Sequence, residues 1–173
     1  MVEVMKKVSE KYEENVKAVR KLFPKALVFD VTAEGAMKKL DPDFPIGEIN
    51  IPGKMWLKGL SLSGVWEGLK VFKNKKEIDE KWMKDENKLG KIRGCKSWGN
   101  VMGFKINDEI VGIEEGNEFF RQMYENLVNE KYGRILEVLK REASSRPVVL
   151  LDYKDERERP FNHVEVLKDM LMH

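Results

Sequence analysis

Apolar positions in the first forty residues follow helix and strand spacings. Near the N-terminus they recur every three or four residues, which predicts a helix over 3–23 that ends at Pro24. The apolar run at 26–31 predicts a short buried strand. Thr32 is then placed to cap a brief helix over 33–40.

The middle of the chain alternates between loops and compact elements. Residues 40–53 contain three prolines and two glycines, which predicts a structured loop with an extended piece at 48–51. A largely apolar helix is expected over 61–73, followed by a charged surface helix over 73–91. The pattern then predicts a hairpin over 103–113 that turns at Asn107 and Asp108.

The last third of the chain predicts helices around one strand. Two apolar clusters indicate helices on either side of Gly133, a candidate break. The run at 147–151 predicts a buried strand, and a final helix is expected to begin near Asn162. The sum is an α+β fold, one compact domain over residues 1–173 with more helix than strand and a few short strands.

Composition is typical of a globular cytoplasmic protein. The chain is 42% hydrophobic and 36% charged, and no run approaches the roughly 18 apolar residues of a membrane span. Charges throughout the N-terminus argue against a signal peptide. One cysteine and two histidines give little support for a metal site, and no cofactor is expected. Abundant Lys and Glu with a single Gln are typical of a thermophile.

The net charge of +2 is unevenly distributed. Residues 54–105 hold 13 Lys and Arg against 6 Asp and Glu. Such an excess favours an anionic partner, either a nucleotide, a phosphate or a nucleic acid, although a solvated lysine-rich face gives the same pattern. Basic residues surround Trp98 in "KLGKIRGCKSWGN", a combination that can stack on and clamp a nucleic acid strand.

Common catalytic motifs are absent. The chain has no glycine-rich phosphate loop of the GxxxxGK[ST] or GxGxxG type, and neither HExxH nor GxSxG. Cys95 and His163 form a nucleophile–base pair only if folding brings them together. We expect His163 to be an exposed residue in the first turn of the last helix.

The helix within "LSLSGVWEGLKVF" (60–72) places polar residues in the most apolar part of the chain. Ser63, Glu67 and Lys70 share one face at helical spacing, with Trp66 beside them. These side chains form either one wall of a pocket or a boundary from which Glu67 and Lys70 reach water. Gly64 and Gly68 form a bare stripe that allows close approach by a ligand or by another helix.

Several segments resemble a family of uncharacterised bacterial and archaeal proteins. The segments are "VFDVT", "LDPDFPIGEINIPG", "SGVWEGLKVF" and "RPVVLLDY", followed by "RPFNHVEVLKDML". In that family a loop like "SPFYPHGGIPVPG" precedes a helix like "SVEGIWQGLKVF" and, later, a strand like "VVLLDY". The resemblance covers most of the chain in the same order but carries no function.

A more distant resemblance is to the NADAR family, which has the YbiA-like fold. Its members have a "LSNFYP"-like loop, a helix of the type "SVEHAFQALK", and later an Asp and an Asn-led C-terminal helix. They are associated with NAD and ADP-ribose metabolism, and characterised members are N-glycosidases. The matching positions are the loop residues Phe44 and Pro45, the helix residues Ser61, Trp66 and Lys70, and the later residues Asp152 and Asn162, with Trp98 a further aromatic candidate.

This chain departs from the NADAR pattern at the centre of the helix. Ser63 stands where that family has glutamate, and Gly64 stands where it has histidine. N-glycosidic cleavage passes through an oxocarbenium-like state that a carboxylate stabilises and a serine does not. Glu67, one turn along the same face, and Asp152, at the end of the predicted strand, are therefore the candidate catalytic carboxylates.

The resemblance implies an N-glycosidase, a hydrolase acting on an ADP-ribose-like or nucleotide-like substrate. Candidate ligand-binding residues are Phe44, Ser63, Trp66, Lys70, Arg93, Trp98 and Asn162, with Lys91 and Lys96 as further phosphate ligands. Two alternatives remain open. The first is a non-catalytic module that binds the same ligand, and the second is a nucleic-acid-associated protein that uses residues 54–105.

Overall fold

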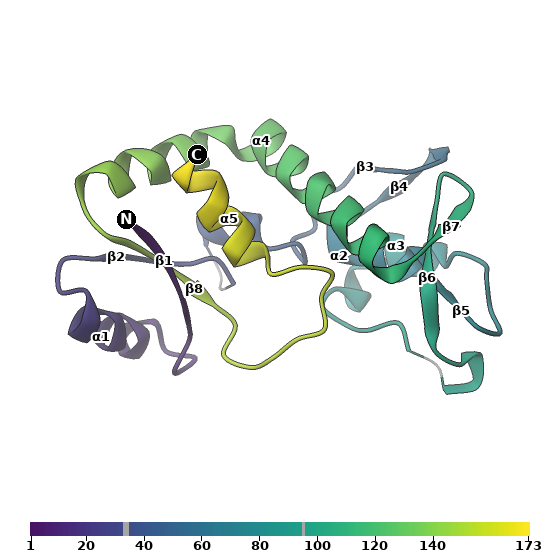
Figure 1. Ribbon diagram of the computed structural model, residues 1–173, viewed down its shortest axis with the longest axis horizontal. Helices are drawn as coiled ribbons and strands as arrows, with labels where there is room; N and C mark the ends of the chain where they lie inside the picture. The colour runs from purple at the N-terminus through teal and green to yellow at the C-terminus, as the bar shows by residue number, and fades with distance from the viewer. Residues whose placement is uncertain (33–34, 95) are drawn as a thin grey trace. The chain divides into compact units, whose positions relative to one another are not determined.

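The computed structural model describes residues 1–32, 35–94 and 96–173 (Figure 1). The α+β class is confirmed, with 46% helix and 21% strand. The chain divides into two compact units. The first comprises 1–41, 125–157 and 162–173, and the second comprises 42–124 and 158–161.

A three-stranded parallel sheet is the centre of the first unit. Its strand order is β1 (Val2–Lys6), β8 (Val148–Asp152) and β2 (Leu27–Asp30). All five residues of the central strand β8 are buried, as expected for a strand that is flanked on both edges and covered on both faces. The helices α1 (Tyr12–Leu22) and α5 (His163–Met172) and a 3-10 turn at Ala36–Leu40 complete the unit, with part of α4.

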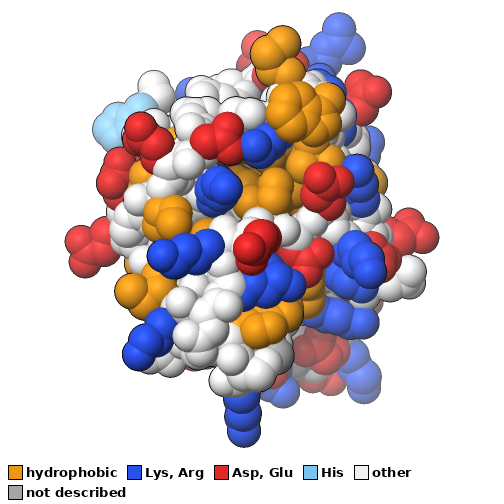
Figure 2. All heavy atoms as spheres, turned by 90° about the vertical axis from the view of Figure 1, so that its right-hand side faces the viewer, with side chains coloured by type: hydrophobic (Ala, Val, Ile, Leu, Met, Phe, Trp, Pro, Cys, Tyr) orange, Lys and Arg blue, Asp and Glu red, His pale blue; other side chains and the backbone are white. Residues whose placement is uncertain are grey.

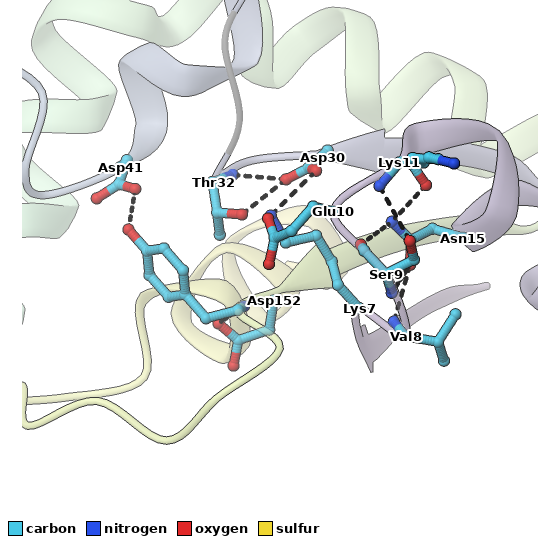
Figure 3. A network of polar contacts seen from close by, with 11 residues as sticks. Lys7, Val8, Ser9, Glu10, Lys11, Asn15, Asp30, Thr32, Asp41 and Asp152 are labelled. Carbon is cyan, nitrogen blue, oxygen red and sulfur yellow. Dashed lines mark hydrogen bonds and ion pairs between the residues drawn. The ribbon is translucent and has the colours of Figure 1, made fainter.

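The predicted helix over 3–23 is wrong in its first part. Residues 2–6 form β1, which pairs in parallel register with β8 from Val2↔Val148 to Lys6↔Asp152. The helix begins only at Tyr12, because Asn15 holds the intervening turn. Its side-chain oxygen accepts the backbone N–H groups of Val8 and Ser9, and its amide donates to the Ser9 carbonyl (Figure 3).

The second unit contains two antiparallel sheets and two short helices. The two-stranded sheet is β3 (Ile49–Ile51) with β4 (Lys54–Gly59), and the three-stranded sheet is β5 (Lys70–Phe72), β6 (Val101–Ile106) and β7 (Glu109–Val111). The helices are α2 (Leu62–Leu69) and α3 (Glu80–Lys84), with 3-10 turns at Glu86–Lys88 and Lys96–Trp98. The predicted extended piece at 48–51 and the 103–113 hairpin are both confirmed.

Two predicted helices of this unit are too long. The helix expected over 61–73 ends at Leu69, because Lys70–Phe72 pair with β6 as the strand β5. The surface helix expected over 73–91 is reduced to α3 and one 3-10 turn, Glu86–Lys88. Both differences arise where residues distant in sequence supply hydrogen bonds that local spacing does not reveal.

The longest helix, α4 (Ile113–Ser145), contributes residues to both units. Its backbone is non-helical at Tyr132 (φ −127°, ψ 19°), next to the predicted break at Gly133. The predicted helix onset at Asn162 is also confirmed, since this residue is the N-cap of α5. Of the brief helix expected over 33–40, residues 33 and 34 lie outside the described residues, and 36–40 form the 3-10 turn.

No described helix combines the length and apolar character needed to cross a lipid bilayer. Within the described ranges, no cluster of three or more His, Cys, Asp or Glu side chains is arranged to hold a metal ion.

The glycine stripe of α2 packs against α3. A Cβ on Gly64 would lie 2.7 Å from the backbone oxygen of Trp82, and one on Gly68 would lie 2.8 Å from that of Asp79. Both distances are far below van der Waals contact. Of the two uses considered for the stripe, the structure therefore shows helix packing.

We predict that Gly68→Ala destabilises the protein by about 1–3 kcal/mol, because the added methyl group meets the backbone oxygen of Asp79, the N-cap of α3. Urea unfolding measures the change. Gly133→Ala is the matched control, since nothing beyond its chain neighbours and the adjacent backbone of its own helix lies within 4 Å of its Cβ position. The control should be neutral or slightly stabilising. Equal effects of the two substitutions would contradict the packing argument.

Candidate functional site

A buried carboxylate–ammonium pair lies where α2 turns into β5. Glu67 is 2% exposed and Lys70 is 1% exposed, so the interpretation in which both reach water is wrong. Lys70 Nζ donates to Glu67 Oε1 at 3.0 Å. Because Lys70 leaves the helix with extended backbone (φ −56°, ψ 134°), its side chain is directed by the start of the strand rather than by helical spacing.

Both oxygens of Glu67 accept hydrogen bonds. The second oxygen, Oε2, accepts the backbone N–H of Arg93 at 2.6 Å. Burial raises the pKa of Glu67 above its ordinary value of 4.5, and the charge and hydrogen bond of Lys70 oppose that rise. A buried carboxyl group whose pKa is raised is a candidate for proton transfer.

The ammonium group of Lys70 is enclosed by one aromatic ring and two carboxylates. Its Nζ lies 3.7 Å from the ring centroid of Trp66, a cation–π contact, and donates to Glu158 Oε1 at 3.1 Å. The Glu158 side chain is 52% exposed, so this partner faces solvent while Glu67 does not. The buried Trp66 Nε1 has no hydrogen-bond acceptor among the described residues.

Arg93 joins the segments around this pair. Its buried guanidinium group donates to the backbone oxygens of Lys70 at 2.5 Å, Gly68 at 3.4 Å and Glu77 at 3.2 Å. Burial lowers its pKa, and the nearby carboxylates of Asp79 and Glu67 oppose that change. Its two terminal nitrogens are directed at backbone carbonyls, and its Nε lies 3.6 Å from Asp79 Oδ2, so its expected role as a phosphate ligand stays a prediction.

Trp98 already has neighbours on its ring. The ring of Phe72 lies 5.3 Å away edge-on, and Lys75 Nζ lies 4.0 Å from the Trp98 centroid. The guanidinium carbon of Arg93 lies 5.2 Å from the same centroid. Stacking of a base on Trp98 stays a prediction. Lys91 and Lys96 are exposed.

The loop with Phe44 is tied to the start of α2. The backbone N–H of Ser63 donates to the Pro42 oxygen at 3.1 Å, and Ser61 caps the helix by accepting from Gly64 N at 3.0 Å. Phe44 and Ser63 are both partly exposed. The loop and the polar helix therefore belong to one local structure, as their proximity in the sequence suggests.

The remaining predicted site residues lie in the first unit. Asp152 ends β8 and is 1% exposed. Its Oδ1 accepts the Tyr153 N–H at 2.8 Å, and its Oδ2 accepts from Asn162 Nδ2 at 3.2 Å. Asn162 Oδ1 in turn caps α5 by accepting from Val164 N at 3.0 Å. His163 is buried rather than exposed, which contradicts our expectation for it.

Two further charged residues lie at the same end of the parallel sheet (Figure 3). Lys7 follows β1 and is buried, with its Nζ 3.5 Å from Asp30 Oδ2 at the end of β2. Asp30 Oδ1 also accepts the Thr32 N–H and hydroxyl. The sequence analysis did not identify Lys7 and Asp30 as neighbours of Asp152, because it did not predict β1. The parallel pairing of β1 and β2 with β8 brings the three residues to the same end of the sheet.

Apart from Phe44 and Ser63, the predicted site residues fall into two groups. Glu67, Trp66, Lys70, Arg93 and Trp98 form a connected cluster in the second unit. Asp152 and Asn162 contact each other in the first unit. Cys95, the candidate nucleophile, lies outside the described residues.

Glu158 was not among the predicted site residues. It lies 88 positions from Lys70, in a charged loop whose sequence carries no signal for a long-range ion pair. A surface hollow in the second unit is lined by none of the predicted residues; its walls are Leu60, Glu80, Lys81, Lys84, Asp85 and Glu86.

The fold and cluster define an α+β protein with a buried, aromatic-backed lysine between two carboxylates. Residues 11–167 match the model of a family described as a family of unknown function, DUF6939, and the chain belongs to that family. Our expectation of an uncharacterised family is confirmed, whereas the NADAR resemblance stays a prediction. No curated protein and no solved structure matches the chain.

We predict that the stability difference between the wild type and Glu67→Gln falls as pH rises above 4.5. With a raised pKa, folded Glu67 keeps its proton where the unfolded chain has lost it, so its contribution is largest at low pH. The loss amounts to about 1.4 kcal/mol for each unit by which the pKa is raised. Urea unfolding at several pH values measures it.

Glu109→Gln, at an exposed position of β7, is the control for removing a carboxylate. A difference between wild type and Glu67→Gln that grows with pH would show that burial does not dominate the titration of Glu67.

Proposed function

We propose that the second unit binds an anionic, nucleotide-like ligand at Lys70, with ADP-ribose as the first candidate. The observation that supports this is the buried Lys70 ammonium group, which lies on Trp66 and has a half-exposed carboxylate on its solvent side. A buried ammonium group needs an anionic partner, and on the solvent side a ligand phosphate satisfies this need as well as a carboxylate does.

Trp66 also supports this proposal, through its contact with Lys70 and its indole N–H rather than by stacking on a base. One side of its ring contacts the Lys70 ammonium, and the Phe104 ring lies 6.2 Å away. Its indole N–H is buried without an acceptor among the described residues. We infer that Trp66 positions Lys70 and offers this N–H to a ligand oxygen, because an unsatisfied buried donor costs about 1–3 kcal/mol.

Hydrolysis of an N-glycosidic bond is the second candidate function. The raised pKa of Glu67 favours it, since burial makes this carboxyl group a better proton donor to a leaving base than an exposed glutamate is. In that reaction the ribose–base bond breaks, water adds to the ribose carbon, and the base leaves with a proton. Both Glu67 oxygens already accept hydrogen bonds, so the geometry supports binding more directly than catalysis.

Nucleic-acid binding is less well supported. On the face drawn in Figure 2, Lys and Arg side chains are interspersed with Asp and Glu. A surface that tracks a phosphate backbone has a continuous basic stripe instead. Single-stranded DNA is therefore one of the probes in the binding test rather than a proposed ligand.

We predict that ADP-ribose raises the melting temperature in a thermal-shift screen that also contains NAD, AMP, nucleoside phosphates and short single-stranded DNA. A ligand at 100 times its Kd stabilises the folded state by about 2.7 kcal/mol. The double variant Glu67→Gln/Lys70→Met removes both charges of the buried pair and should lose the shift. Lys58→Met, at an exposed position of β4, should keep it. A shift by DNA alone would reject the proposal.

If the protein is a hydrolase, we predict that Glu67→Gln slows release of adenine from AMP, a base that needs a proton to leave, by about 100-fold or more while ADP-ribose still binds. Chromatography of the released base measures the rate. Asp152→Asn, in the first unit, tests the other candidate carboxylate. Turnover lost only in Asp152→Asn would assign catalysis to Asp152. Binding without turnover by the wild type would identify a non-catalytic binding module.

A further inference from the structure

The partner of Lys70 on its solvent side is a residue of the chain itself. Glu158 Oε1 accepts from Lys70 Nζ at 3.1 Å, and its side chain is 52% exposed. Glu67, the other partner, is buried and also holds the Arg93 backbone. Of these two carboxylates, only Glu158 can leave without opening the core.

We propose that Glu158 is a built-in competitor that occupies the position of the ligand's anionic group and must be displaced for binding. The inference rests on the proposed function, because it assigns the regulation of the same Lys70 site. Exchange of one anion for another keeps the ammonium group neutralised throughout, so displacement leaves no unpaired buried charge.

The backbone around Glu158 supports such an exchange. Residues 158–161 belong to the second unit, whereas the residues on either side of this segment belong to the first. Phe161 anchors the segment, with its ring 5.3 Å from that of Tyr124. No regular secondary structure includes Glu158, so its side chain can turn to solvent without breaking a helix or strand.

Tethering makes Glu158 a selective competitor. A carboxylate held by a short segment has an effective concentration in the millimolar range, which simple anions at lower concentration do not overcome. A ligand with further contacts, such as an acceptor for Trp66 Nε1, gains enough free energy to displace it. The site is thereby expected to reject free phosphate and to accept a larger molecule that carries phosphate.

The test compares ADP-ribose affinity, measured by titration calorimetry, in the wild type, Glu158→Gln and Asp155→Asn. Glu158→Gln should lower the Kd by about threefold to tenfold, since the competing charge is gone. Asp155 lies in the same loop, is exposed, and forms none of the Lys70 contacts. Asp155→Asn removes an equal charge and should stay within about twofold of the wild type.

Glu158→Asp is the second variant and keeps the charge while shortening the side chain. It should tighten binding in the same direction as Glu158→Gln, because the shorter carboxylate no longer reaches Lys70 at 3.1 Å. A Kd for Glu158→Gln that equals that of Asp155→Asn, or that is weaker than the wild type, would overturn the inference and leave the proposed function intact. Absence of binding by every variant and the wild type would reject the proposed function, and the inference with it.

Discussion

The ion pair of Lys70 and Glu67 is the interaction on which the second unit depends. Two opposite charges are buried between α2 and β5, and removal of Lys70 leaves the buried Glu67 without its charged partner, a loss that typically costs about 3–5 kcal/mol. Three neighbouring residues stabilise these two buried charges. Arg93 supplies a backbone donor to Glu67, Trp66 supplies an aromatic face to Lys70, and Glu158 supplies a second carboxylate.

Arg93 extends this local pair into the surrounding structure. Its guanidinium group bonds the carbonyls of Gly68 and Lys70, at the end of α2 and the start of β5, and that of Glu77, before α3. The close packing of Gly68 on α3 fixes the same junction from its other side. On its buried side Lys70 is held by the hydrogen bond to Glu67 and the contact with the Trp66 ring, whereas Glu158, its partner at the solvent side, is 52% exposed. A ligand can replace Glu158 on the solvent side of Lys70 while the contacts on the buried side stay in place, which is why we propose a binding site here.

Sequence patterns predicted part of the candidate site for identifiable reasons. Glu67, Lys70 and Trp66 could be grouped because they are separated by one helical turn or less, and the contact between Glu67 and Lys70 is local. Arg93 was selected for its charge, but its position inside the cluster, 26 residues from Glu67, had no sequence signal. Lys7 and Asp30 lie near the end of β8 only because three strands from distant parts of the chain pair in parallel.

The amino-acid sequence by itself determined the features that depend on neighbouring residues. Asn107 and Asp108 form the hairpin turn because their side chains tolerate the positive φ values of 50° and 67° that this turn requires. Asn162 caps α5 because its side chain accepts hydrogen bonds from the first backbone N–H groups of the helix. Tertiary structure decided that residues 2–6 and 70–72 are strands rather than helix, because β8 and β6 offer hydrogen bonds that outweigh the local helical period. It also decided that Glu158 meets Lys70 across 88 residues, a contact that exists only once the chain has folded.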